Sequence, residues 1–128
     1  MMMMKKESIH SDKAPAAVGP YSQAIEVNGF VFASGQLPIN PQTGSFPEGI
    51  REQTRQSILN AQSILNAAGL ELSNVIRTTV YLSDMANFSA MNEVYSEYFQ
   101  QPYPARSAVA VRSLPKDALV EIECIACR

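Results

Sequence analysis

Apolar and polar residues alternate along the last quarter of the chain with the period of β-strands. In residues 106–112 every second side chain falls on the same face, and residues 119–127 repeat the pattern. An alternation of period two indicates half-buried strands. Between the two segments, Pro115-Lys116-Asp117 has the residue types of a tight turn. We therefore expect these segments to form a β-hairpin.

One face of this expected hairpin has an unusual composition. The second strand places Val120, Ile122, Cys124 and Ala126 together on a face suited to a core. The other face mixes small apolar residues with charged ones: Arg106, Ala108, Ala110, Arg112, Glu121, Glu123 and Ile125. Such a mixture suggests a surface that is covered, with charge kept in it for a purpose.

The first half of the chain predicts a second hairpin. The apolar segments 21–27 and 30–37 are joined by Asn28-Gly29, and this dipeptide favours a type I′ turn with positive φ at both positions. The second segment contains Ser34-Gly35-Gln36, where a glycine inside a strand often marks a close approach to the backbone. Residues 38–49 are rich in Pro and Gly and are expected to form a loop.

Between the hairpins the hydrophobic period changes to that of helices. Apolar residues recur every three or four positions in residues 50–68, which predicts an amphipathic helix with Gly69 just after its end. Residues 74–82 alternate again and predict a strand. A second helix can be capped by Ser83 or Asp84 and must end before Pro102; its apolar stripe is Phe88, Met91, Tyr95 and Tyr98.

The predicted order is ββ-αβ-α-ββ, which is typical of an α+β fold with two helices packed on one face of a single sheet. Two helices cannot also cover the opposite face. That face would expose an apolar patch, which monomers rarely tolerate: Thr79, Tyr81, Ala108, Ala110 and Ile125. We therefore expect self-association through the bare sheet face with closed symmetry, although the pattern does not distinguish two copies from three.

Composition places the chain among small globular proteins. Its 128 residues, 46% hydrophobic and 17% charged, fit one domain at 14–128 that follows an expected disordered tail at 1–13. The net charge of −2 and the lack of a Lys/Arg cluster argue against a nucleic-acid partner. No apolar run suits a membrane span or a secretory signal, so we expect no membrane partner and a cytoplasmic location.

The residues that commonly hold metals or act as nucleophiles are sparse. Cys124 and Cys127 fall on opposite faces of the last strand and have no second pair or histidine partner, so we interpret them as structural thiols. The one histidine, His10, lies in the expected tail. These observations predict neither a metal site nor histidine-based catalysis.

Three residues are candidates for chemistry, and each also has a purely structural interpretation. Arg106 could clamp a small carboxylate with its guanidinium fork, or pair with a surface carboxylate. Glu121 could act as a general acid or base, or pair with Arg112, which lies nearly opposite in the expected hairpin. Tyr21 could orient a substrate, or be a half-buried aromatic residue where a strand begins.

Four motifs support the functional interpretations. They are Gly19-Pro20-Tyr21-Ser22-Gln23-Ala24, Ser34-Gly35-Gln36, Pro104-Ala105-Arg106-Ser107, and Leu114-Pro115-Lys116-Asp117 leading to Val120-Glu121-Ile122-Glu123. Together they resemble the RidA family of reactive-intermediate deaminases, from Ala14 to the end of the chain. The resemblance implies a chorismate-mutase-like fold, a homotrimer with sites between subunits, and no cofactor. It also implies hydrolysis of 2-imino acids, such as 2-iminopropanoate and 2-iminobutanoate released by pyridoxal-phosphate-dependent dehydratases, to 2-keto acids and ammonia.

The resemblance also assigns roles to particular residues. Arg106 would bind the substrate carboxylate, Glu121 would handle a water and its protons, and Tyr21 would line the pocket. Substrate-binding positions would be Ser34, Gly35, Asn92 and the main chain near Ala108, although Asn92 on a helix could equally be a surface residue. Many relatives carry cysteine where this chain has Ala108. Imine hydrolysis needs no thiol nucleophile, because the iminium carbon is already electrophilic.

Two other functions stay open at this point. One is a single-strand ribonuclease or translation inhibitor, an activity also attached to the family but disfavoured by the negative net charge. The other is a ligand-sensing regulatory protein without turnover. The expected hairpin separates Arg106 from Glu121 by six residues, or roughly 20 Å. We therefore expect the active site to lie between chains.

Overall fold

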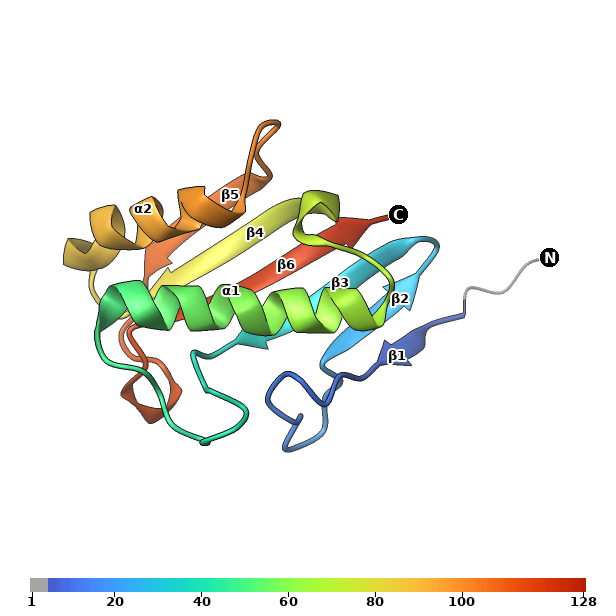
Figure 1. Cartoon of the computed structure of the whole chain (residues 1–128), viewed down its shortest axis with the longest axis horizontal. Coiled ribbons are helices and arrows are strands. Elements are labelled where there is room, and N and C mark those ends of the chain that lie inside the picture. Colours follow the sequence, from blue (N-terminus) through green and yellow to red (C-terminus); the bar gives the residue numbers. More distant parts are fainter. Residues whose placement is uncertain (1–4) are drawn as a thin grey trace.

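A six-stranded sheet with both α-helices across one face makes up the computed structural model, which describes residues 5–128 (Figure 1). The strands are β1 (Glu7–Ile9), β2 (Ala24–Val27), β3 (Phe30–Gln36), β4 (Val75–Leu82), β5 (Ala105–Ala110) and β6 (Val120–Cys127). The helices are α1 (Gly49–Ala67) and α2 (Phe88–Tyr98). The α+β class and the predicted order from β2 to β6 are confirmed. In the sheet, the strands lie in the order β1-β2-β3-β6-β4-β5.

The first strand corrects one expectation. Residues 1–13 were expected to be a disordered tail, yet Glu7–Ile9 form β1 and pair antiparallel with β2. The sequence pattern did not indicate this strand, because the residues before and after it are mostly polar or charged. An edge strand can form without a long apolar pattern, since it is held mainly by backbone hydrogen bonds and needs little apolar burial. Residues 1–4 lie outside the described residues.

The expected hairpin at the end of the chain is wrong. β5 pairs in parallel with β4 at the edge of the sheet, whereas β6 lies between β3 and β4 and pairs antiparallel with both. The connection over residues 111–119 is nine residues long, longer than the usual hairpin loop of two to five residues. That length lets the chain pass β4 before β6 begins. Pro115–Asp117 form a tight turn within this connection, with positive φ at Lys116 and Asp117.

The other turn predictions are confirmed. Asn28 and Gly29 have φ values of 50° and 81°, as a type I′ turn between β2 and β3 requires. After α1, Gly69 has φ 77°, and the amides of Gly69 and Leu70 donate to the carbonyls of Asn66 and Leu65. This is the Schellman arrangement that terminates a helix with a glycine.

The two faces of the sheet have different environments. On β6, Val120, Ile122, Cys124 and Ala126 are buried under the helices, as predicted. The opposite face is left uncovered by the chain, and Phe30 and Phe32 on it are 40% and 44% exposed. None of the helices in residues 5–128 combines the length and apolarity needed to cross a lipid bilayer.

Two alanines were assigned to the wrong face. Ala108 and Ala110 were expected on the bare face, but they pair in register with Val80 and Leu82, which are buried on the helix side. Ala108 packs against the core as a result. The error follows from the wrong pairing partner for β5, because register with β4 decides which way its side chains point. Thr79, Tyr81 and Ile125 do alternate with buried neighbours and lie on the bare side.

Candidate active site

Arg106 lies near the start of β5 and reaches toward α2. Its Nη1 donates to Oδ1 of Asn92 at 2.7 Å, and its Cζ lies 4.8 Å from the ring centre of Tyr95 and 5.6 Å from that of Phe88. Among residues 5–128 no carboxylate lies within ion-pair distance of it. The interpretation of Arg106 as half of a surface ion pair is therefore wrong for this chain. Its positive charge is held by neutral groups and remains uncompensated.

A cleft of about 440 Å³ opens beside this guanidinium. It is lined by Asn92, Tyr95, Ser96, Tyr103, Pro104 and Arg106. The volume falls within the range of small-molecule sites in proteins. A cleft with one uncompensated cation, an amide and aromatic walls suits a small carboxylate-bearing molecule. Asn92 is thus a member of the cleft and not merely a surface residue.

Glu121 lies on the bare face of β6, where β4 places Tyr81 opposite it. Burial, followed by the nearby charge of Glu123, raises the pKa of the Glu121 carboxyl above its ordinary value of 4.5. The expected pairing with Arg112 is wrong, because β6 does not pair with β5 at all. Glu123 accepts a hydrogen bond from the hydroxyl of Tyr81. A carboxyl with a raised pKa on an uncovered surface is suited to exchanging protons.

Gly35 provides the space that the Glu121 side chain occupies. A Cβ atom at position 35 would lie 2.9 Å from Cδ of Glu121 and would collide with its carboxylate oxygen. The pairing of β3 with β6 is irregular between Ala33 and Gln36, so a bulge accommodates this approach. The predicted close approach at Gly35 is confirmed, and its partner is the carboxylate itself.

Ser34 and Tyr21 adjoin this region. The Ser34 hydroxyl donates to the Ser22 carbonyl at 2.7 Å, which holds the segment containing Tyr21 beside β3. The Tyr21 side chain is 54% exposed and makes no side-chain hydrogen bond among the described residues. It is therefore available to contact a ligand or another subunit.

Within one chain the candidate residues form two separate groups. Arg106, Asn92 and Ala108 lie on the helix side, whereas Glu121 lies on the bare side next to Gly35. Register places Arg106 opposite Thr78 and Glu121 opposite Tyr81, three residues apart along β4. The separation of roughly 20 Å expected from a hairpin is therefore wrong, since three residues span about 10 Å. The opposite faces nevertheless prevent both groups from serving one substrate within a single chain.

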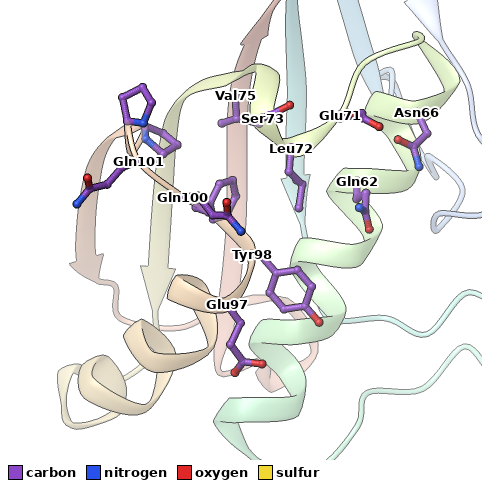
Figure 2. A pocket seen from close by; sticks show the side chains of 13 residues that line it. Gln62, Asn66, Glu71, Leu72, Ser73, Val75, Glu97, Tyr98, Gln100 and Gln101 are labelled. Atoms are coloured by element: carbon purple, nitrogen blue, oxygen red, sulfur yellow. The ribbon is translucent and has the colours of Figure 1, made fainter.

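A larger cleft of about 530 Å³ lies elsewhere, between the C-terminal parts of the two helices (Figure 2). None of the candidate residues lines it. No Arg or Lys lines it, and its labelled polar side chains are amides, carboxylates and hydroxyls: Gln62, Asn66, Glu71, Ser73, Glu97, Tyr98, Gln100 and Gln101. Two carboxylates and no cation make this cleft a poor site for an anionic acid, so the smaller cleft at Arg106 is the better candidate.

The sequence interpretation missed two residues of the Arg106 site. Phe88 and Tyr95 were assigned only to the apolar stripe of the second helix, yet both rings face the guanidinium. With Asn92 they occupy positions i, i+4 and i+7, which share one helix face. That spacing could have indicated the site, because an amide within an otherwise aromatic face needs a polar partner.

Comparison with known proteins gives consistent relationships over nearly the whole chain. The family model described as endoribonuclease L-PSP matches residues 11–128. The chain is 54% identical to a RutC family protein of Pyrococcus abyssi, covering 96% of this chain and 98% of the relative. It is 50% identical to the chloroplastic Reactive Intermediate Deaminase A of Arabidopsis thaliana, covering 96% of this chain and 66% of the relative.

Two solved structures are similar in fold as well as in sequence. The RidA structure from an Antarctic Psychrobacter has a TM-score of 0.92 at 45% identity, covering 95% of this chain and 99% of that one. The structure of Escherichia coli TdcF with bound serine has a TM-score of 0.92 at 44% identity, covering 95% and 98%. These similarities confirm the chorismate-mutase-like α+β fold inferred from the sequence.

Proposed function

The chain belongs to the endoribonuclease L-PSP family, which includes RidA and other proteins named reactive intermediate deaminases, and from that premise we propose that it hydrolyses 2-imino acids to 2-keto acids and ammonia. The observation that carries the proposal is the uncompensated Arg106 at the wall of a cleft of suitable size. The proposed substrates are small, such as 2-iminopropanoate and 2-iminobutanoate.

Arg106 is proposed to bind the substrate carboxylate. A guanidinium fork matches two carboxylate oxygens, and its charge is available because the side chain is held only by Asn92 and two aromatic rings. β5 is an edge strand, so main-chain groups along its outer side, near Arg106 and Ala108, are free to hydrogen-bond a ligand. The serine bound to TdcF also carries a carboxylate, which is consistent with this role.

Glu121 is proposed to move the protons of the reaction. A water adds its oxygen to the imine carbon, Glu121 accepts a proton from that water, and the nitrogen is protonated. The resulting carbinolamine then loses ammonia as its C–N bond breaks and the C=O bond forms. The sum is imine plus water giving keto acid plus ammonia, with no oxidant or reductant. The raised pKa of Glu121 brings it closer to neutrality, where general acid–base groups work best.

The complete site is proposed to form between copies of the chain. One copy supplies Arg106 with Asn92, and a neighbouring copy supplies Glu121 with Gly35, Ser34 and an exposed Tyr21. The bare sheet face, with its exposed Phe30 and Phe32, supports such an association because water would otherwise contact this apolar surface. We propose a homotrimer as the closed assembly.

Two other functions are compared with this proposal: a ribonuclease, which the description of the family model suggests, and a ligand-sensing protein without turnover. Ribonuclease activity finds little support here, because the net charge is −2 and the one histidine, His10, bonds to Asp12 in the exposed N-terminal segment. A ligand-sensing protein without turnover would use the same arginine and cleft. Turnover is therefore the property that separates the proposed deaminase from both alternatives.

The experiment generates 2-iminobutanoate in situ and follows the release of 2-ketobutanoate and ammonia. We expect the protein to accelerate release above the spontaneous rate, and Arg106→Ala to abolish the acceleration. Arg112→Ala is the matched control, since Arg112 follows the same strand but lies outside the cleft lining. Unaccelerated release with wild-type protein that still binds 2-ketobutanoate would favour the sensor, and cleavage of single-stranded RNA would favour the ribonuclease.

A further inference from the structure

The environment of Arg106 points to one residue beyond those assigned above. We infer that Tyr95 is a positioning residue: its ring, anchored through its hydroxyl to Thr78, holds the Arg106 guanidinium in the orientation that receives a carboxylate. This inference rests on the proposed role of Arg106 in binding the substrate. It assigns no chemical step to Tyr95, which acts only through the arginine.

One face of α2 is organised around the guanidinium. Phe88, Asn92 and Tyr95 follow one another at steps of four and three residues, so they project from α2 in one direction. The amide oxygen of Asn92 accepts from Nη1 at 2.7 Å, and the Tyr95 ring is the nearer of the two aromatic rings at 4.8 Å. A cation within about 6 Å of a ring centre is attracted to the electron-rich face.

The Tyr95 ring is itself fixed from three sides. Its side chain is 5% exposed, its hydroxyl lies 2.7 Å from Oγ1 of Thr78, and its ring packs 4.4 Å from that of Phe99. Thr78 is fully buried and pairs in register with Arg106 across β4 and β5. Tyr95 therefore bridges an adjacent pair of strand residues, anchored to one and contacting the other. Burial raises the pKa of its hydroxyl, so the anchoring group stays protonated at neutral pH.

Asn92 and Tyr95 carry no charge, so they can position Arg106 without neutralising it. A carboxylate partner would orient Arg106 equally well but would neutralise it and compete with the substrate. An aromatic face and an amide oxygen restrict the side chain while leaving its charge available. Less conformational entropy is then lost when the ligand binds, which raises affinity without a new contact to the ligand.

The same molecule contains a contrasting arrangement. Arg55 lies 5.8 Å from the ring centre of Tyr98, one turn further along α2, but it also pairs with Glu52 and Glu97. Its charge is satisfied by carboxylates on the surface, so this arginine is unavailable to an anion. Tyr98 is therefore a matched control: the same residue type, on the same helix, in contact with another arginine.

The test changes the electron density of the ring at nearly constant shape. Tyr95 is replaced by phenylalanine and by phenylalanines carrying one, two or three fluorines, and the dissociation constant of 2-ketobutanoate is measured by calorimetry. Fluorine withdraws electron density from the ring face, so affinity should fall stepwise, by about threefold to thirtyfold across the series, as the range of cation–π strengths implies. The same series at Tyr98 should stay within about twofold.

The fluorinated variants are compared with Tyr95→Phe and not with the wild type. All members of the series lack the hydroxyl that bonds Thr78, so they differ only in fluorination. Thermal unfolding of each variant checks that the core is preserved. A second measurement, the Nε–H resonance of Arg106 in the unliganded protein, should broaden along the Tyr95 series and remain unchanged along the Tyr98 series. This resonance reports the positioning directly, even if 2-ketobutanoate binds too weakly for calorimetry.

The outcomes distinguish this inference from the proposed function. Affinity and an Arg106 resonance that are both insensitive to fluorination would overturn the role of Tyr95, whether or not the protein hydrolyses imines. Fluorine-dependent binding in a protein that fails to accelerate imine hydrolysis would support the role of Tyr95 and reject the deaminase. A purely structural tyrosine would alter the melting temperature without a graded effect on carboxylate affinity.

Discussion

Replacing Glu121 with glutamine tests the chemistry with the smallest change in shape. Glutamine retains the length and most hydrogen bonding of the side chain, and it fits the same space above Gly35. It cannot accept a proton from water. We therefore expect the Glu121→Gln protein to fold and assemble like the wild type, to bind 2-ketobutanoate with similar affinity, and to lose turnover.

The magnitude follows from the role assigned to the carboxylate. General acid–base groups commonly contribute a hundredfold or more to the rate, and a hundredfold loss corresponds to about 2.7 kcal/mol of transition-state stabilisation. Binding of the keto acid should change little, because the carboxylate is assigned to Arg106, which the substitution leaves intact. The loss should therefore appear in kcat and leave KM nearly unchanged.

The pH dependence provides an independent check. Ionised Glu121 is the form that accepts a proton, and burial together with Glu123 raises its pKa above 4.5. The activity of the wild type should thus decline with acidification at a pH above 4.5. Glu123→Gln removes the neighbouring charge, which lowers the pKa of Glu121 and moves this decline to lower pH. The decline should be absent from the residual activity of Glu121→Gln.

The Glu121→Gln substitution should lower activity but should not lower the stability of the fold at pH 7. Because the pKa of Glu121 is higher in the folded than in the unfolded protein, its protonated form favours the fold at pH values below the unfolded pKa, and this contribution is lost as the pH rises through the folded pKa. Ionised Glu121 therefore costs stability at pH 7, and Glu121→Gln should melt at a temperature equal to or above that of the wild type. The advantage should fade near pH 4, with all proteins compared at one concentration. A fully active Gln variant would refute the catalytic role.

Three further substitutions examine the remaining assignments. Arg106→Lys keeps the charge but loses the fork, so kcat/KM should fall about tenfold to a thousandfold, or about 1.4 to 4 kcal/mol; near-normal kinetics would remove the clamp. Gly35→Ala displaces the Glu121 carboxylate, and turnover should drop at least about tenfold while keto-acid binding persists; unchanged turnover would show that the carboxylate position is unimportant. Ala108→Cys should leave the rate within a few fold and add sensitivity to thiol reagents, whereas a large gain in rate would show that sulfur contributes to the chemistry.

The class of the fold could be predicted from local patterns alone. Alternation identified β2, β3, β4, β5 and β6, and Asn28-Gly29 specified the first hairpin because its backbone conformation depends on those two residues. Helical periodicity and Gly69 likewise predicted α1 and its end. These elements were predictable because neighbouring residues determine them.

Strand pairing could not be predicted in the same way. Alternation shows that β5 and β6 each have two faces, but not that β4 lies between them. That error transferred Ala108 to the wrong face and placed Arg112 opposite Glu121. β1 escaped detection because its pairing depends on the backbone of β2 and not on its own side chains.

In the candidate site, too, local sequence motifs identified some residues, whereas other features depended on how the elements pack. Arg106, Gly35 and Glu121 could be singled out from motifs, but the aromatic surroundings of Arg106 depend on how α2 packs against β5. Tyr95 was assigned to the apolar stripe of the second helix, because its spacing with Asn92 indicates a polar partner but does not identify that partner as Arg106. The separation of the site into two groups also required the pairing of β5 and β6 with β4.

The most direct test of the account is complementation between two inactive proteins. Arg106→Ala and Glu121→Gln chains are unfolded together, refolded as a mixture, and assayed for hydrolysis of 2-iminobutanoate. If each site combines Arg106 of one copy with Glu121 of its neighbour, some interfaces in mixed assemblies contain both intact residues and part of the activity returns. Mixed assemblies that form, as mass spectrometry can verify, yet stay inactive would contradict a site shared between chains.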